Sequence, residues 1–189
     1  MKKMKKMKKM KKMKKKTMNN QASVCPGMAV SPTKIRKRVT FEEVFMQMAY
    51  LWAQRAVCVR RRVGAILVRD NHVLATGYNG PPKGIEHCTK ESCIRTKLNI
   101  PSGDKQEVCR GLHAEQNVLI QAAVEGVSVK GSVLYCTNKP CITCLKMLIN
   151  SGIKYVVYDQ EYKDELTTQM ATEAGVYLYK YNGSKSETI

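Results

Sequence analysis

The second half of the chain alternates patterns that are typical of helices and strands. Apolar residues have helical spacing from 113 to 125, and the pattern stops at Gly126. Segments of the two kinds then follow in turn, with strands expected at 132–137, 153–158 and 176–181 and helices at 141–151 and 163–174. Because strands that alternate with helices form layered sheets with parallel neighbours, this half predicts an α/β domain.

The first half predicts one helix and one hairpin. Residues 40–57 have the spacing of an amphipathic helix, opened by a capping box of Thr40 and Glu43. Residues 63–78 fit an antiparallel β-hairpin with a polar turn at Asp70 and Asn71. The sheet is therefore expected to be mixed, with helices on both faces. Residues 84–112 predict a long loop, which is unusual in a compact domain unless something holds it.

Positive charge is concentrated at the N-terminus. Eleven of the 33 lysines and arginines lie in the Met/Lys repeat of residues 1–16, and the remaining 22 against 15 acids leave a net charge of +7. We expect a disordered basic arm and linker over 1–39, a folded domain over 40–182 and a flexible tail over 183–189. The alternative for the arm is a cationic patch for nucleic acid or anionic lipid.

The eight cysteines favour metal binding or catalysis over disulfides. We recognise no export signal and no apolar run of the roughly 18 residues that a membrane span needs. The chain is therefore expected to be cytoplasmic, where thiols stay reduced.

Two short motifs carry the chemistry. His113 and Glu115 form one, and Pro140 followed by Cys141 and Cys144 forms the other. One histidine and two cysteines suit a tetrahedral Zn²⁺ whose fourth position is open to water. Zinc can lower the pKa of that water to about 7, and Glu115 is the expected proton carrier. The combination is the signature of zinc nucleobase deaminases.

With these motifs, residues 41–181 resemble the cytidine and deoxycytidylate deaminase superfamily, most closely its dCMP deaminase branch. The resemblance also rests on CVRRRVGAILV (58–68), TGYNGPPKG (76–84), HC (87–88) and CRGLHAEQN (109–117). It implies a cytidine-deaminase-like three-layer α/β/α fold with a five-stranded mixed sheet. It further implies a homo-oligomer, a hexamer or smaller, that dCTP activates and dTTP inhibits.

The resemblance implies hydrolysis of dCMP to dUMP and ammonia, which supplies the thymidylate precursor. At the matching positions, the Ala114 N–H meets the pyrimidine carbonyl and Asn79 reaches the sugar hydroxyl. Asn79 has an alternative role as a left-handed turn residue before Gly80. Tyr162 is a further candidate for the nucleotide site. The 5′-phosphate needs cations, and the sequence does not choose among Arg60, Arg61, Arg62, Lys83 and Arg110.

A second set of cysteines predicts a structural zinc with a closed coordination sphere. This site would hold the long 84–112 segment, and its expected ligands are Cys58, Cys88, Cys93 and Cys109. The resemblance supports Cys58 and Cys88, while the last two ligands stay open, with His87 as a substitute. The alternative is four reduced thiols without a metal.

Two other functions compete with a nucleotide deaminase. A nucleic-acid base deaminase, acting on tRNA adenosine or single-stranded cytosine, could use the basic arm, but the arm has no aromatic residues for stacking bases. A non-catalytic zinc or nucleotide-binding protein would not need Glu115.

Overall fold

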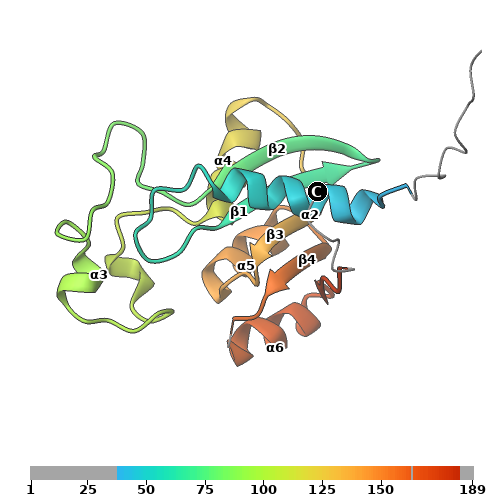
Figure 1. Cartoon of the computed structure of the whole chain (residues 1–189). Coiled ribbons are helices and arrows are strands. Elements are labelled where there is room, and N and C mark those ends of the chain that lie inside the picture. The colour runs from blue at the N-terminus through green and yellow to red at the C-terminus, as the bar shows by residue number, and fades with distance from the viewer. Residues whose placement is uncertain (1–37, 163, 184–189) are drawn as a thin grey trace, which may run out of the picture. The chain divides into compact units, whose positions relative to one another are not determined.

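The structure is a computed structural model that describes residues 38–162 and 164–183 (Figure 1). The predicted arm and tail lie outside these ranges except for residues 38, 39 and 183. No helix in the described ranges is both long enough and apolar enough to cross a membrane.

A mixed five-stranded sheet forms the centre of the described domain. Its strands are β1 (Gly64–Arg69), β2 (His72–Tyr78), β3 (Val133–Asn138), β4 (Tyr155–Gln160) and β5 (Tyr177–Lys180). They lie in the order β2-β1-β3-β4-β5. The strand β1 is antiparallel to β2 and β3, whereas the β3–β4 and β4–β5 pairs are parallel. The predicted hairpin and the predicted parallel half are thereby confirmed.

Helices cover both faces of this sheet, as predicted (Figure 1). The longer ones are α2 (Phe41–Ala53), α4 (Ala114–Val124), α5 (Ile142–Asn150) and α6 (Glu165–Glu173). On one face, Phe45 of α2 packs against Ile66 and Val68 of β1. On the other face, α4, α5 and α6 enclose a larger core that includes Val118 and Leu148. The expected three-layer α/β/α fold is confirmed.

The first helix begins as predicted but ends earlier. The Thr40 hydroxyl accepts a hydrogen bond from the Glu43 N–H over 3.2 Å, and the Glu43 carboxylate accepts one from the Thr40 N–H over 2.9 Å. The predicted end near Val57 was wrong, because the helix stops at Ala53. Tighter three-residue hydrogen bonds then turn the chain toward β1, and buried Ala56 belongs to this turn.

Two glycines let helix backbones rest directly on the sheet. A Cβ atom on Gly64 of β1 would collide with the carbonyl oxygen of Ala49 in α2. A Cβ atom on Gly77 of β2 would lie 2.5 Å from the carbonyl oxygen of Ala114 in α4. The contact at Gly77 places the start of α4 against the end of β2.

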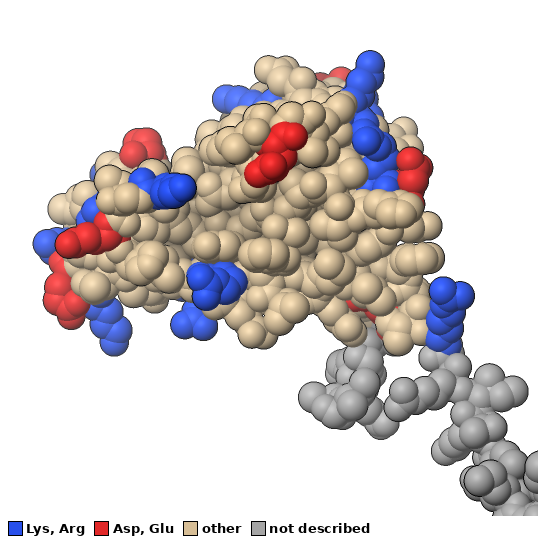
Figure 2. Space-filling model, turned by 90° about the horizontal axis from the view of Figure 1, so that it is seen from above, with Lys and Arg blue, Asp and Glu red and all other residues tan. Residues whose placement is uncertain are grey.

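The segment between β2 and α4 contains two short helical turns, α3 (Ile94–Lys97) and a 3₁₀ turn (Gln106–Val108). In Figure 1 this segment extends to one side of the sheet. The face seen in Figure 2 shows lysine and arginine side chains in small separate groups, interspersed with acidic ones. That face carries no continuous basic band.

Candidate metal centre and active site

The structure brings His113, Cys141 and Cys144 together. The histidine precedes α4, Cys141 precedes α5, and Cys144 lies in the first turn of α5. The Nδ1 atom of His113 is 3.5 Å from the Cys141 sulfur and 3.3 Å from the Cys144 sulfur. All three ligand atoms lie within 4.8 Å of one another. One nitrogen and two sulfur donors at this spacing fit the tetrahedral coordination of Zn²⁺ with one position left for water.

Backbone hydrogen bonds fix the approach to α4. The loop after β2 and the segment before α4 are joined by two hydrogen bonds between Gly80 and Leu112, 3.1 and 2.8 Å long. The Gln116 side chain then accepts a hydrogen bond from the His113 N–H over 2.8 Å. The Asn117 amide donates to the Tyr78 carbonyl oxygen over 2.7 Å. The position of His113 is thus tied to the end of β2.

The start of α5 is tied to the start of α6. One carboxylate oxygen of Asp164 accepts a hydrogen bond from the Ile142 N–H over 3.1 Å.

Hydrogen bonds from Cys144 and from His113 outweigh burial and lower the pKa of Cys141 to about 4. The pKa of Cys144 is raised, because it shares a proton with Cys141 and is buried. The cluster is thus suited to hold an anionic sulfur, which is the form that binds metal.

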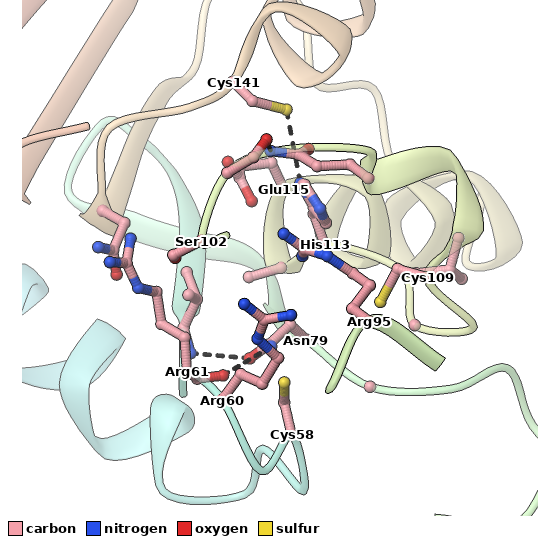
Figure 3. A pocket seen from close by; sticks show the side chains of 18 of the residues that line it. Cys58, Arg60, Arg61, Asn79, Arg95, Ser102, Cys109, His113, Glu115 and Cys141 are labelled. Carbon is pink, nitrogen blue, oxygen red and sulfur yellow. Dashed lines mark hydrogen bonds between the residues drawn. The ribbon is translucent and has the colours of Figure 1, made fainter. Parts of the chain in front are cut away.

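Glu115 is a buried carboxylic acid beside the metal set. Only 4% of the residue is exposed, although it lies in the first turn of a helix at the edge of a pocket. Burial raises the pKa of Glu115 to about 7. Figure 3 shows Glu115, His113 and Cys141 around one end of this pocket. A carboxyl group in this place can exchange protons with a molecule bound there.

The pocket also includes the residues that sequence analysis assigned to the substrate. These are Asn79, Ala114 and Tyr162. Ala114 is the first residue of α4, where a backbone N–H has no partner within the helix. Ala114 is fully buried at the edge of this pocket.

The Asn79 side chain has a structural role as well. Its amide nitrogen donates to the Arg61 carbonyl oxygen over 2.9 Å, and its amide oxygen accepts from the Val63 N–H over 2.7 Å. These bonds hold the segment that leads into β1. Asn79 is not among the residues with positive φ, so the alternative of a left-handed turn residue was wrong.

Tyr162 connects the pocket wall to the end of β4. Its hydroxyl donates to the Gly103 carbonyl oxygen over 3.0 Å and accepts from the Gln106 amide nitrogen over 3.0 Å. The long segment 84–112, which was predicted to need support, is therefore held partly by Tyr162.

The second set of cysteines lines the same pocket but is more widely spaced. The four residues are Cys58, Cys88, Cys93 and Cys109. Among residues 38–162 and 164–183, three or more potential metal-binding atoms lie within 4.8 Å of one another only at His113, Cys141 and Cys144. The four cysteines of the second set are not this close together. His87 is exposed and does not line the pocket. The structural zinc therefore stays a prediction.

The structure separates the candidate cations. Arg60 and Arg61 line the pocket, whereas Arg62, Lys83 and Arg110 do not. Arg95 on α3 also lines the pocket and was not predicted from the sequence. The segment around α3 has no periodic pattern, and its one signal was the nearby Cys93.

Comparison with known proteins agrees with this geometry. Residues 39–160 match the family described as the cytidine and deoxycytidylate deaminase zinc-binding region. The chain belongs to the cytidine and deoxycytidylate deaminase family. The matched range contains both zinc motifs, and the resemblance identified from sequence is confirmed.

Several relatives in this deaminase family are named deoxycytidylate deaminase. The chain is 42% identical to that of Schizosaccharomyces pombe over 147 residues, covering 77% of this chain and 45% of the yeast protein. It is 36% identical to that of Saccharomyces cerevisiae over 155 residues, covering 80% of this chain and 48% of the relative. The chain thus spans about half the length of these two curated relatives.

One solved structure is similar to this chain over the whole length of the solved protein. It is the crystal structure of dCMP deaminase from the cyanophage S-TIM5 in complex with dCMP and dUMP. The TM-score is 0.63 at 33% sequence identity, and the match covers 77% of this chain and 100% of that one.

Proposed function

We propose that this protein is a zinc-dependent dCMP deaminase, which converts dCMP and water to dUMP and ammonia. The observation that carries the proposal is the buried Glu115 carboxyl beside the His113, Cys141 and Cys144 cluster. A metal site with a structural role alone needs no buried acid at its edge. The names of the yeast relatives and the nucleotides bound to the cyanophage protein support dCMP as the substrate. We further propose that the reaction supplies the thymidylate precursor and takes place in the cytoplasm.

Glu115 moves the protons in the proposed reaction. When bound, zinc supplies one effect, which is to lower the pKa of a water molecule. In the overall reaction, the oxygen of a water molecule replaces the amino group on carbon 4 of the cytosine ring. Glu115 passes one of its protons to ring nitrogen 3 and carries the other to the departing amino group, so that the bond from carbon 4 to nitrogen breaks and ammonia leaves. The buried position of Glu115 keeps these transfers away from bulk water.

The remaining pocket residues orient the substrate. The Ala114 N–H at the start of α4 is proposed to donate to the pyrimidine carbonyl oxygen. Asn79 is proposed to reach the sugar hydroxyl with the part of its amide that Arg61 and Val63 leave free. Tyr162, fixed by its bonds to Gly103 and Gln106, is proposed to form the wall beside the nucleotide.

Regulation and assembly are proposed from the family resemblance. We expect a homo-oligomer, a hexamer or smaller, which dCTP activates and dTTP inhibits. Light scattering of the protein with and without each nucleotide tests the assembly, and rate measurements with each nucleotide test the regulation.

A second zinc is proposed for the four pocket cysteines. Cys88 is close enough to the other three for their charges to raise its pKa, in addition to the effect of burial. A zinc ion would lower the pKa of these thiols and bind the four sulfurs as thiolates, which would draw them together. Such an ion would be structural, since four protein ligands leave no position for water.

Ammonia release tests the proposed reaction. The zinc-loaded protein is given dCMP, dCTP, deoxycytidine, or an oligonucleotide that contains cytosine and adenine. We expect turnover of dCMP, and Glu115→Gln should lower it at least about 100-fold with zinc content and melting temperature unchanged. If Glu115→Gln keeps full activity, the proposed proton transfers are wrong.

The same experiment decides between the two alternatives. Turnover of the oligonucleotide alone would identify a nucleic-acid base deaminase, with the lysines of residues 1–16 as the contact to the substrate. Binding of dUMP without any ammonia release would identify a non-catalytic nucleotide-binding protein.

A further inference from the structure

Both sides of Cys141 are attached to the start of α6. On the side of α5, the Ile142 N–H donates to a carboxylate oxygen of Asp164 over 3.1 Å. On the side of β3, the Lys139 ammonium group donates to the Thr168 hydroxyl over 3.0 Å. Asp164 is the residue that precedes α6, and Thr168 lies near the start of that helix. The loop that carries Cys141 is therefore held on both flanks by one helix start.

The Asp164 carboxylate serves two helices at once. Its Oδ1 atom accepts a hydrogen bond from the Thr167 N–H over 3.0 Å, which caps α6. Its Oδ2 atom accepts one from the Thr167 hydroxyl over 2.7 Å and the bond from the Ile142 N–H. Thr167 is fully buried, so its two bonds fix the direction of the carboxylate. The same group thus holds the first residue of α5.

The bond from Asp164 replaces a cap that Cys141 does not provide. Cys141 is the N-cap residue of α5, and its side chain makes no hydrogen bond to the helix. A serine or an aspartate at such a position usually accepts a bond from the first turn, whose N–H groups have no partner within the helix. The Cys141 sulfur instead lies 3.5 Å from the Nδ1 atom of His113. Because the sulfur belongs to the metal cluster, the acceptor for α5 comes from the neighbouring helix.

Lys139 holds the other flank through several bonds. Its ammonium group pairs with the Glu161 carboxylate over 3.0 Å, and the Tyr158 hydroxyl donates to the second oxygen of that carboxylate over 3.1 Å. The Lys139 N–H donates to the Gln160 carbonyl oxygen over 2.9 Å. Only 10% of the lysine side chain is exposed, so solvent screens the ion pair less than it would on an open surface.

We propose that Asp164 is a positioning residue for the catalytic zinc, which holds the start of α5 so that the Cys141 and Cys144 sulfurs are arranged before the metal binds. The proposal rests on the proposed function and adds a residue that supports the metal site from outside the ligand set. Lys139 has a smaller share in the same role, because its backbone bond to Gln160 does not need the side chain. Partners behind the metal ligands typically change metal affinity about 10- to 100-fold.

Metal binding tests the positioning role without any need for turnover. Competition with a chelator measures zinc affinity, and the absorption bands of bound Co²⁺ report how the sulfur and nitrogen ligands are arranged. The bands that Cys144→Ser removes belong to this site. We expect Asp164→Ala to weaken zinc binding about 10-fold and to alter these bands. Asp164→Asn has one oxygen for two helices and should lie between Asp164→Ala and the parent, and Lys139→Met should show a smaller loss.

Thr40→Ala is the matched control, because it removes the cap of α2, a helix without metal ligands. It should lower the melting temperature and leave zinc affinity unchanged. Thr167→Val keeps the Asp164 bond to Ile142 and should stay within about threefold of the parent in zinc affinity.

Two results would overturn the positioning role. One is an Asp164→Ala variant that binds zinc and Co²⁺ as the parent does. The other is a Thr40→Ala variant that loses as much zinc affinity as Asp164→Ala, since the effect would then be general destabilisation. A parent protein that binds zinc but releases no ammonia from dCMP would contradict the proposed function instead, and the metal measurements would still decide the role of Asp164.

Discussion

The hydroxyl of Tyr162 donates a hydrogen bond to the carbonyl oxygen of Gly103 over 3.0 Å, across 59 residues of sequence. Gly103 has a φ of +101°, and a Cβ atom there would lie 2.6 Å from the same hydroxyl. The tyrosine and the glycine therefore form one close contact, which fixes a wall of the pocket against the end of β4.

Tyr162→Phe should loosen this wall. The variant loses the bonds to Gly103 and Gln106, each worth about 0.5–1.5 kcal/mol, so urea unfolding should show lower stability. The KM for dCMP should rise more than kcat falls, because the chemical groups at Glu115 stay in place. Tyr179→Phe, on an exposed tyrosine of β5, is the control and should change neither quantity. A normal KM in Tyr162→Phe would show that the wall does not contact substrate.

Gly77→Ala should destabilise the fold. The added methyl group would lie 2.5 Å from the Ala114 oxygen and 2.6 Å from the Val118 nitrogen, and backbone atoms cannot move aside cheaply. We expect a loss of about 1–3 kcal/mol in the free energy of unfolding. Gly80→Ala, whose Cβ would meet nothing closer than 3.7 Å, should stay within about 1 kcal/mol of the parent. Equal stability of the two variants would contradict the close packing of α4 on β2.

Zinc content should reveal two kinds of site. Metal analysis of the purified protein should find about two zinc ions per chain, and Cys109→Ser should lower the count by one and lower the melting temperature. Cys136→Ser is the control, because Cys136 is fully buried in β3 and is not proposed to bind metal. A count of one in the unchanged protein would eliminate the second zinc.

Asp164 should make stability depend on pH. Burial acts to raise the pKa of Asp164, but hydrogen bonds from Thr167 and Ile142 outweigh it and hold the pKa below its ordinary value. The carboxylate therefore stabilises the folded state above the unfolded pKa of about 3.9, and this contribution is lost as the pH falls through the lower folded value.

Asp164→Ala should cost about 1 kcal/mol at neutral pH, and the difference from the parent should shrink below about pH 4. Asp164→Asn, which keeps a capping oxygen, should lose less. Urea unfolding across the pH range measures both differences. A difference that stays constant down to pH 3 would mean that the carboxylate charge contributes nothing.

Removal of residues 1–16 should leave dCMP deamination unchanged. These residues hold eleven lysines but none of the groups assigned to the pocket. Binding of the full chain to an oligonucleotide should weaken steeply with salt if the arm contacts phosphates, and truncation should remove that dependence. A large loss of dCMP turnover on truncation would give the arm a role in the enzyme.

The sequence predicted the sheet well because the relevant signals are local. Strand and helix patterns alternate after residue 113, and the glycines at 126, 152 and 175 that were expected to end helices all have positive φ. The two zinc motifs are equally local, since each fits within one helix start. The alternation of strands and helices indicated that the helix starts carrying His113 and Cys141 could lie close together.

The rest depended on contacts between distant residues. The early end of α2 is set by the turn toward β1, which apolar spacing does not reveal. Residues 84–112 are aperiodic, so neither the bond from Tyr162 nor the position of Arg95 could be predicted. The structural role of Asn79 was hidden for the same reason, because its partners precede it by 16 and 18 residues.

Gly64 and Gly77 lie at neighbouring positions of the same hairpin, where Gly64 pairs with Tyr78 and Ala65 pairs with Gly77. One glycine receives α2 on one face, and the other receives α4 on the opposite face. At this point the hairpin acts as a spacer one peptide backbone thick between two helices. A mutational library should therefore strongly disfavour side chains larger than hydrogen at these two positions. The absence of two methyl groups thus sets how closely α2 and α4 approach each other across the hairpin.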